Sequence, residues 1–205
     1  MTNKKPSAST PASGPDSTWT TTPTTLRPNR RYITTHDPQT GKSIYAASPP
    51  QIYARTPALG GMARSFATDR IPVDFTDEGD VKRYRGGTES AASYRQRHIV
   101  VPDGGVNLVV VDLLPGAESG MHRTKSVDFS ICVLGEIVHE LDSGETRVLL
   151  PGDHIVQRGT MHKWINGSKT EPARFVAVTV PAAEFEIPGT GGRMLEEEHL
   201  PKAKL

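Results

Sequence analysis

Apolar residues in the second half of the chain occur in short runs, which glycine, proline or polar turns separate at intervals of roughly 8 to 12 residues. Each run has the length and the β-branched composition of a strand. Such regular short strands are typical of an all-β barrel or sandwich, and neither an internal repeat nor a βαβ alternation interrupts them. The predicted strands are 98–101, 107–114, 127–134, 136–141, 146–150, 154–157, 163–165 and 174–180.

Polar residues within these strands fall on common faces, because successive side chains of a strand point to opposite sides of the sheet. The residues that share a face are His122 with Thr124, Asp128 with Ser130 and Cys132, and His162 with Trp164 and Asn166. In a small barrel, inward-facing groups converge on one interior. Buried polar groups are costly unless they satisfy one another, a metal or a ligand, so this pattern predicts a functional pocket.

The first half of the chain has a different pattern. Ser, Thr and Pro make up 16 of the first 25 residues, a composition that buries too little apolar surface to offset the entropy of ordering. Residues 31–47 predict a hairpin with its turn at 36–41. Residues 48–93 show no sustained period and are expected to wrap over another surface.

Together these patterns predict a disordered tail, an arm that packs on the barrel, the barrel itself and a C-terminal extension with a short helix. The predicted boundaries are 1–30 for the tail, 31–95 for the arm, 96–185 for the barrel, 186–205 for the extension and 193–199 for its helix.

Charge and cysteine content narrow the possible partners. Lys and Arg number 24 against 23 Asp and Glu, a net charge of +1, which argues against electrostatic binding to nucleic acid or a membrane surface. The apolar runs fall far short of the roughly 18 residues that span a bilayer. The one cysteine, Cys132, forms no internal disulfide, which is consistent with a reducing compartment, and we predict a cytoplasmic protein.

Two spaced motifs make the prediction more specific. The first reads Gly116, five residues, His122, one, Thr124, three, Asp128, six, Gly135. The second reads Gly152, six residues, Gly159, two, His162, three, Asn166. This region resembles the two motifs of the cupin family, with Thr124 in place of the second histidine and Asp128 in place of glutamate. The resemblance implies an all-β fold with a single cupin barrel, a double-stranded β-helix of the jelly-roll type.

A narrower resemblance rests on the strings 122–124, 127–129 and 156–160 followed by His162. They are similar to VirC- and OryJ-like cupins of fungal secondary-metabolite clusters. This similarity implies a small-molecule enzyme that acts on a polyketide-like or aromatic intermediate by oxidoreductase-type chemistry. Cupins often dimerise by exchanging N-terminal strands, so the resemblance also implies a homodimer in which hairpin 31–47 takes part.

The resemblance implies that His122, Asp128 and His162 form the catalytic centre and hold a divalent metal, Fe, Mn or Zn. Two histidines and a carboxylate suit such an ion, although Asp is shorter than Glu and Thr is a poor ligand. Without a metal, one histidine would act as general base and Asp128 would orient it, giving an isomerase, dehydratase or cyclase. The same residues would also suit a non-catalytic metabolite-binding cupin or a purely structural network of hydrogen bonds.

Several further residues are candidates for contact with the substrate. Those assigned to substrate binding are Thr124, Arg158, Trp164 and Asn166. Arg158 has a planar guanidinium fork that suits a carboxylate or phenolate, and its purely structural alternative is a salt bridge at the rim of the barrel. Trp164 could stack on an aromatic ring, and its purely structural alternative is core packing. Pattern alone leaves open whether His139 and His154 reach the pocket.

Overall fold

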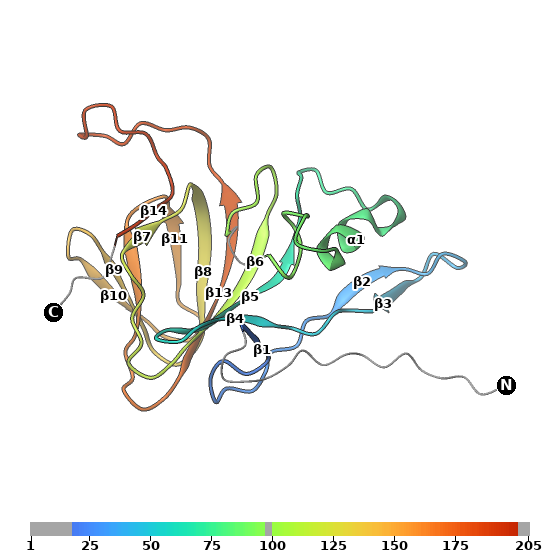
Figure 1. Cartoon of the computed structure of the whole chain (residues 1–205), viewed down its shortest axis with the longest axis horizontal. Helices are drawn as coiled ribbons and strands as arrows, with labels where there is room; N and C mark the ends of the chain where they lie inside the picture. Colours follow the sequence, from blue (N-terminus) through green and yellow to red (C-terminus); the bar gives the residue numbers. More distant parts are fainter. Residues whose placement is uncertain (1–17, 97–99, 201–205) are drawn as a thin grey trace.

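The computed structural model describes residues 18–96 and 100–200. Two open β-sheets face each other, a seven-stranded sheet in the order β1-β4-β5-β6-β13-β8-β11 and a five-stranded sheet in the order β10-β9-β12-β7-β14 (Figure 1). The strands of the first sheet are β1 (Trp19–Thr20), β4 (Tyr53–Thr56), β5 (Gly60–Ala67), β6 (Asn107–Leu113), β8 (Ser126–Leu134), β11 (His154–Arg158) and β13 (Ala173–Pro181). The strands of the second are β7 (His122–Arg123), β9 (Ile137–Leu141), β10 (Thr146–Leu149), β12 (His162–Asn166) and β14 (Glu198–His199).

The predicted strands from residue 107 onward are confirmed, and each end agrees within one residue. Prediction succeeds here because turns and apolar runs alternate cleanly. Of the predicted strand 98–101, residues 98 and 99 are not described, and residues 100 and 101 form a bend and not a strand. The all-β prediction is thereby confirmed for the barrel region.

Strand β8 shows how the alternation builds the interior. Asp128 and Cys132 are buried on its inner face, whereas Phe129 and Ile131 on the outer face are 45% and 38% exposed. Between the sheets the inner side chains form one apolar cluster, whose buried members are Val109, Val111, Leu113, Ala117, Cys132, Ile137, Leu149, Trp164, Ala173, Phe175 and Ala177. The core therefore lies between the two sheets, as in a sandwich.

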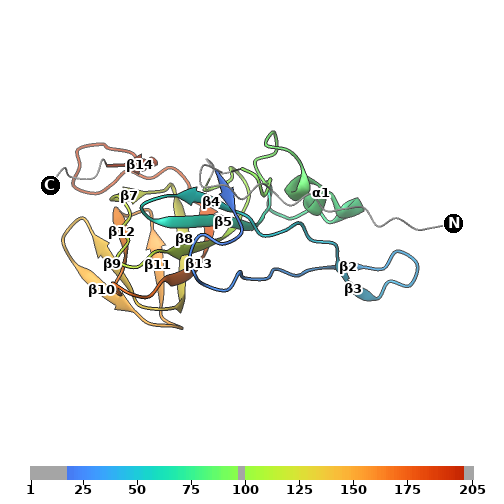
Figure 2. The same ribbon diagram turned by 60° about the horizontal axis from the view of Figure 1, so that its bottom comes forward.

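The predicted hairpin forms β2 (Ile33–His36) and β3 (Ser43–Ala46), which pair with each other. Figures 1 and 2 show that it projects away from the two large sheets instead of packing on them. The irregular segment after it supplies β4 and β5, which extend the large sheet beside β6. A 3-10 turn η1 (Thr76–Glu78) and helix α1 (Gly79–Arg85) follow, and in the described part of the chain no helix is long and apolar enough to cross a membrane.

The tail predicted to be disordered is partly ordered. Residues 1–17 lie outside the described residues, but Trp19 pairs with Ala54 in the sheet. The guanidinium of Arg174 donates to the carbonyl of Arg27. Composition predicted too little order in this segment because it counts only local apolar residues. The order of the segment depends on backbone pairing and on a distant arginine, which such a count does not include.

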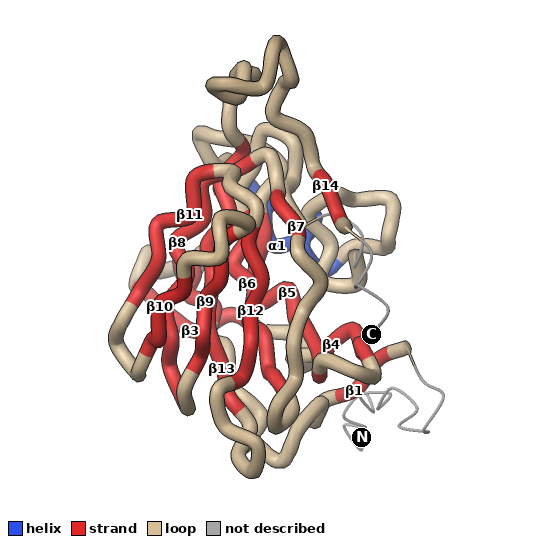
Figure 3. Tube along the Cα trace, turned by 90° about the vertical axis from the view of Figure 1, so that its left-hand side faces the viewer, coloured by secondary structure: helices blue, strands red, loops and turns tan. Residues whose placement is uncertain are grey.

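The C-terminal extension is an extended strap and not the predicted helix. Within it, β14 pairs with β7, with His199 opposite His122, and Figure 3 shows the two strands side by side. The buried side chain of Leu195 packs against Gly159 and holds the strap in place. A Cβ added to Gly159 would lie 2.9 Å from the side chain of Leu195. A tertiary strand partner has overridden the local helix preference of the acidic run before His199.

Candidate active site

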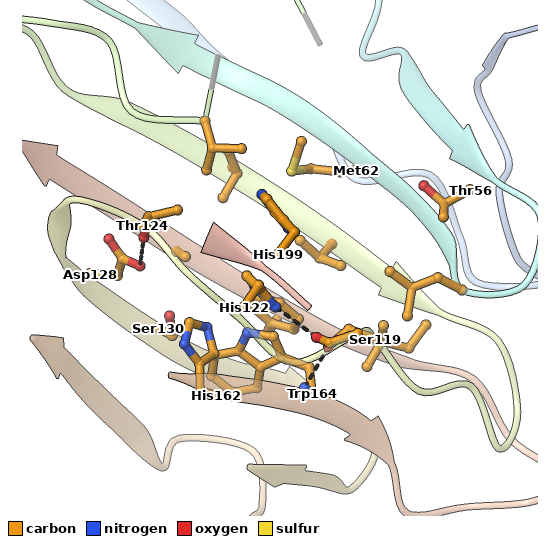
Figure 4. A pocket seen from close by; sticks show the side chains of 18 of the residues that line it. Thr56, Met62, Ser119, His122, Thr124, Asp128, Ser130, His162, Trp164 and His199 are labelled. Atoms are coloured by element: carbon orange, nitrogen blue, oxygen red, sulfur yellow. Dashed lines mark hydrogen bonds between the residues drawn. The ribbon is translucent and has the colours of Figure 1, made fainter. Parts of the chain in front are cut away.

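A cavity of about 440 Å³ lies between the two sheets. Figure 4 shows His122, His162 and Trp164 grouped together in it, with Thr124 and Asp128 to one side. Apolar side chains from β5, β6 and β13 form much of the rest of the wall. The lining residues that bear on chemistry are Glu118, Ser119, His122, Thr124, Asp128, Ser130, His162, Trp164, Thr179 and His199.

His122 and His162 come from neighbouring strands and face each other. They are opposite one another in the β7–β12 pair, and their ring centroids are 4.4 Å apart. Nδ1 of His122 lies 2.8 Å from the carbonyl of Gly120, and Nδ1 of His162 lies 3.0 Å from the carbonyl of Thr160. A carbonyl only accepts, so Nδ1 carries the proton in both rings and the lone pair is on Nε2. Each imidazole is thus oriented as a base or ligand through Nε2.

A second layer fixes the orientation of His162. The amide of Gln157 donates to the carbonyl of Thr160 at 2.9 Å and accepts from Nε2 of His139 at 2.8 Å. His139 stacks on His162 with centroids 5.4 Å apart, but it is not among the residues lining the cavity. The polar groups of Gln157 and His139 bond to each other and to Thr160. They therefore orient His162 but do not line the cavity.

Burial makes the two facing imidazoles weak bases. Desolvation is the largest cause lowering the pKa of His162 to about 3, and His122 and His139 nearby lower it further. The pKa of His122 is also lowered, again mainly by burial. A charged imidazole loses its hydration in such a site, so both rings are neutral at physiological pH.

Asp128 belongs to a separate hydrogen-bond group. Its carboxylate accepts from the hydroxyl of Ser126 at 2.6 Å and from that of Thr124 at 3.3 Å. Both histidines donate instead to backbone carbonyls, so the expected arrangement in which Asp128 orients a histidine is not found. Burial raises the pKa of Asp128, and the two hydroxyls oppose that rise. Asp128 and Thr124 form a polar corner of the cavity beside the imidazoles.

The donor set as arranged does not fit a metal centre. A divalent ion in a protein takes at least three side-chain ligands in the common sites. Across residues 18–96 and 100–200, no group of three or more His, Cys, Asp or Glu side chains is placed to hold one. The two Nε2 atoms could serve as two ligands, but Asp128, which accepts from Ser126 and Thr124, is not grouped with them as a third.

Comparison with known proteins shows to which family the chain belongs. No family model matches the chain. The cupin-domain-containing oxidoreductase fogC of Aspergillus ruber is 33% identical over 165 residues, covering 78% of this chain and 75% of that protein. The chain belongs to the cupin family. The cupin-domain-containing oxidoreductase virC of Hypocrea virens is 31% identical, covering 79% of this cupin and 80% of its own length.

A third relative is a biosynthesis cluster protein. Phomopsin biosynthesis cluster protein D of Diaporthe leptostromiformis is 41% identical, covering 80% of this chain and 84% of that protein. Among solved structures, recombinant oxalate oxidase in complex with glycolate is 29% identical over 36% of this chain and 41% of its own, with a TM-score of 0.33. The resemblance deduced from the two motifs is confirmed at the level of the family.

The residues that the motifs assigned to the cupin site divide into two groups. His122, Thr124, Asp128, His162 and Trp164 all line the cavity, whichever of them acts on a ligand. The rest lie elsewhere. They are Arg158, whose side chain is exposed, and Asn166, which is fully buried beside β12. His154, whose place the sequence pattern left open, is also exposed and does not line the cavity.

Asn166 has a structural part in this cupin. Its amide donates to the carbonyl of Leu114 at 3.0 Å and to that of Glu171 at 2.8 Å, and its oxygen accepts from the backbone of Ser168. It therefore ties the end of β12 to two loops. Arg158 points outward because it alternates with the inward-facing Gln157, so neither Arg158 nor Asn166 is kept in the candidate site.

Sequence reasoning missed His199 and Leu200, which also line the cavity. His199 stacks on His122 with ring centroids 5.6 Å apart and an interplanar angle of 4°. It was interpreted as part of a helix, and no motif marks it. The only signal was a histidine beside an acidic run near the end of the chain.

The neutral state of His162 predicts a pH dependence of stability. Its pKa is about 3 in the folded protein and 6.5 in the reference state, so the unfolded chain binds more protons between these values. The contribution of neutral His162 to the free energy of unfolding is fully present above pH 6.5 and is lost as the pH falls toward 3. The free energy of unfolding then changes by up to about 1.4 kcal/mol per pH unit. Asp128, whose pKa is raised, contributes with the opposite sign.

We therefore expect His162→Phe to flatten the fall in melting temperature of the metal-free protein between pH 7 and pH 5. Calorimetry on the variant and the parent in the same buffers measures this difference. Parallel curves for the two proteins would show that His162 is not held neutral by burial.

Proposed function

We propose that this cupin is an enzyme of secondary-metabolite biosynthesis, which takes an uncharged, largely apolar carbonyl compound and moves a proton next to the carbonyl. The class of intermediate is polyketide-like or aromatic. The observation that carries the proposal is a pair of neutral imidazoles, His122 and His162, whose Nε2 lone pairs remain available in a largely apolar cavity. The name of phomopsin biosynthesis cluster protein D supports the biosynthetic setting.

The cavity wall supports a neutral, aromatic ligand. Its described lining contains no Lys or Arg, while it includes Glu118 and Asp128, so a carboxylate or phosphate would be desolvated without a cationic partner. Aromatic rings run along one side, with His162 and Trp164 at 5.5 Å and Trp164 and Phe175 at 4.6 Å between centroids. A flat ring can stack on such a row.

The proposed step uses only groups of this chain. Nε2 of His162 takes a proton from the carbon next to the carbonyl, so that a C–H bond breaks, an N–H bond forms and the electron pair passes to the carbonyl oxygen. The hydroxyl of Ser130, which lines the cavity, is a donor for that oxygen. Return of the proton to another atom completes an isomerisation. The Nε2 lone pair of the neutral imidazole is free to accept this proton, and because burial makes the ring a weak base, the ring readily gives the proton back in the second half of the step.

The test uses 2-acetylnaphthalene and its anionic analogue 2-naphthoate. We expect the ketone to bind at least about tenfold more tightly than the carboxylate in calorimetry, because the carboxylate gains no cationic partner. In D₂O, proton NMR should show catalysed exchange of the acetyl protons of the ketone. Binding without exchange would instead indicate a non-catalytic metabolite-binding cupin, and no binding of the ketone would overturn the proposal.

A metal-dependent oxidoreductase is the second candidate, and the names of fogC and virC favour an oxidoreductase without naming a metal. Fe, Mn or Zn in stoichiometric amount in the purified protein, lost in His122→Ala and in His162→Ala, would establish it over the acid–base enzyme. We expect the metal content to be substoichiometric, since no third ligand joins the two histidines in the described part of the chain. Elemental analysis of the three proteins decides between the two candidates.

We also propose that the cupin is a homodimer. The support is an apolar outer surface on β8 and β11, where Phe129 and Val156 are opposite each other and 45% and 53% exposed. Light scattering should give twice the chain mass of 22.2 kDa, and Phe129→Asp should shift the protein toward the monomer. A parent protein with the mass of one chain would contradict this.

A further inference from the structure

The strap of residues 182–200 crosses from the end of β13 to the outer edge of β7. Polar contacts hold its last part in place. Arg123 donates through Nε to the carbonyl of Glu196 at 3.2 Å and forms an ion pair with Glu198 at 2.8 Å. The backbone N–H of Leu200 donates to the carbonyl of Met121 at 2.9 Å. The strap is therefore attached specifically to the strand that carries His122.

His199 is held from two sides at the cavity. Its Nε2 lies 3.0 Å from a carboxylate oxygen of Glu197, and its ring stacks parallel on that of His122. Glu197 accepts only, so Nε2–H donates to it. With centroids 5.6 Å apart, the two rings leave no room for a third ring between them. Figure 4 shows His199 beside His122 within the group of lining side chains.

We propose that the strap is a wall of the substrate pocket and that His199 is a substrate-binding residue. The proposal rests on the proposed function, because it takes the same cavity to be the site. His199 continues the row of rings formed by His122, His162 and Trp164, and so extends the surface on which a flat ligand lies. Leu200, which also lines the cavity, adds apolar contact next to it. The ligand class is an uncharged molecule with a planar ring.

The role of the strap as a wall is tested without any ligand. The chain has two tryptophans, Trp19 and Trp164, so Trp19→Phe leaves the lining Trp164 as the one fluorescent reporter. In that background, acrylamide quenching should rise about twofold or more in His199→Ala and Leu200→Ala, because a pocket wall shields what it encloses. Glu196→Ala is the matched control, since its side chain is exposed on the same strap, as those of His199 and Leu200 are, but does not line the cavity. Equal quenching in all variants would overturn the wall.

The role of His199 in binding is tested with 2-acetylnaphthalene in the full chain. Loss of one aromatic contact should weaken binding about 2- to 10-fold in His199→Ala, whereas His199→Phe retains the stack and stays near the parent. Glu196→Ala should bind like the parent. If the parent binds and His199→Ala matches Glu196→Ala, His199 is not a binding residue. If the parent itself fails to bind, the proposed function fails, and the quenching experiment still decides whether the strap is a wall.

Discussion

His162→Phe is expected to slow exchange of the acetyl protons of 2-acetylnaphthalene by about 10²–10⁴-fold, the usual contribution of a positioned general base. Phenylalanine has a similar shape and keeps the contact with Trp164, but it has no lone pair at the position of Nε2. His162 is 3% exposed, so the packing around it limits reorientation of the new ring. The carbonyl of Thr160 loses the Nδ1 donor but still accepts from the amide of Gln157. NMR in D₂O measures the rate.

His154→Phe is the matched control for this experiment. His154 is exposed on β11 and does not line the cavity, so the same substitution there should leave the exchange rate within about twofold of the parent, as surface changes usually do. Retention of the parent rate by a folded His162→Phe protein would remove His162 as the base. Binding of the ketone should persist in the variant, which separates loss of chemistry from loss of the pocket.

Arg174→Leu is expected to destabilise the protein by about 3–5 kcal/mol, because it leaves a buried carboxylate without its partner. Asp112 is 0% exposed, and Arg174 donates to its two oxygens at 2.5 Å and 2.7 Å. The same guanidinium donates to the carbonyl of Arg27, so the contact also anchors the segment that carries β1. The free energy of unfolding from urea titration is the quantity to measure.

Two further variants test the cause of that loss. Arg158→Leu makes the same substitution at an exposed arginine and should change the free energy of unfolding by no more than about 0.5 kcal/mol. Adding Asp112→Leu to Arg174→Leu should recover much of the stability, since replacing both members of a buried pair by apolar residues is often near neutral. A double variant as unstable as Arg174→Leu alone would show that packing and not the unpaired charge is responsible.

Turn residues and the two-residue period explain why so much of the barrel was predictable. Gly135 has a φ of +81°, and an added Cβ would lie 2.8 Å from the Cβ of Ala173, so this position of the first motif requires glycine. On β8, alternation alone decided that Asp128 is inside and Phe129 outside. Local rules of this kind act within a strand and its turn, so they can be read along the chain.

The sequence by itself determined the all-β class, the strands from residue 107 onward, the cupin family and the positions of His122 and His162 on a common interior. Only the tertiary structure decided that His199 joins them, that Asp128 bonds to Ser126 and Thr124, and that residues 18–30 are ordered. Each of these depends on a partner that is distant in the chain or on the direction of a single side chain. Strand periodicity assigns a face, but the partners of a side chain are set only when the sheets and the strap have packed together.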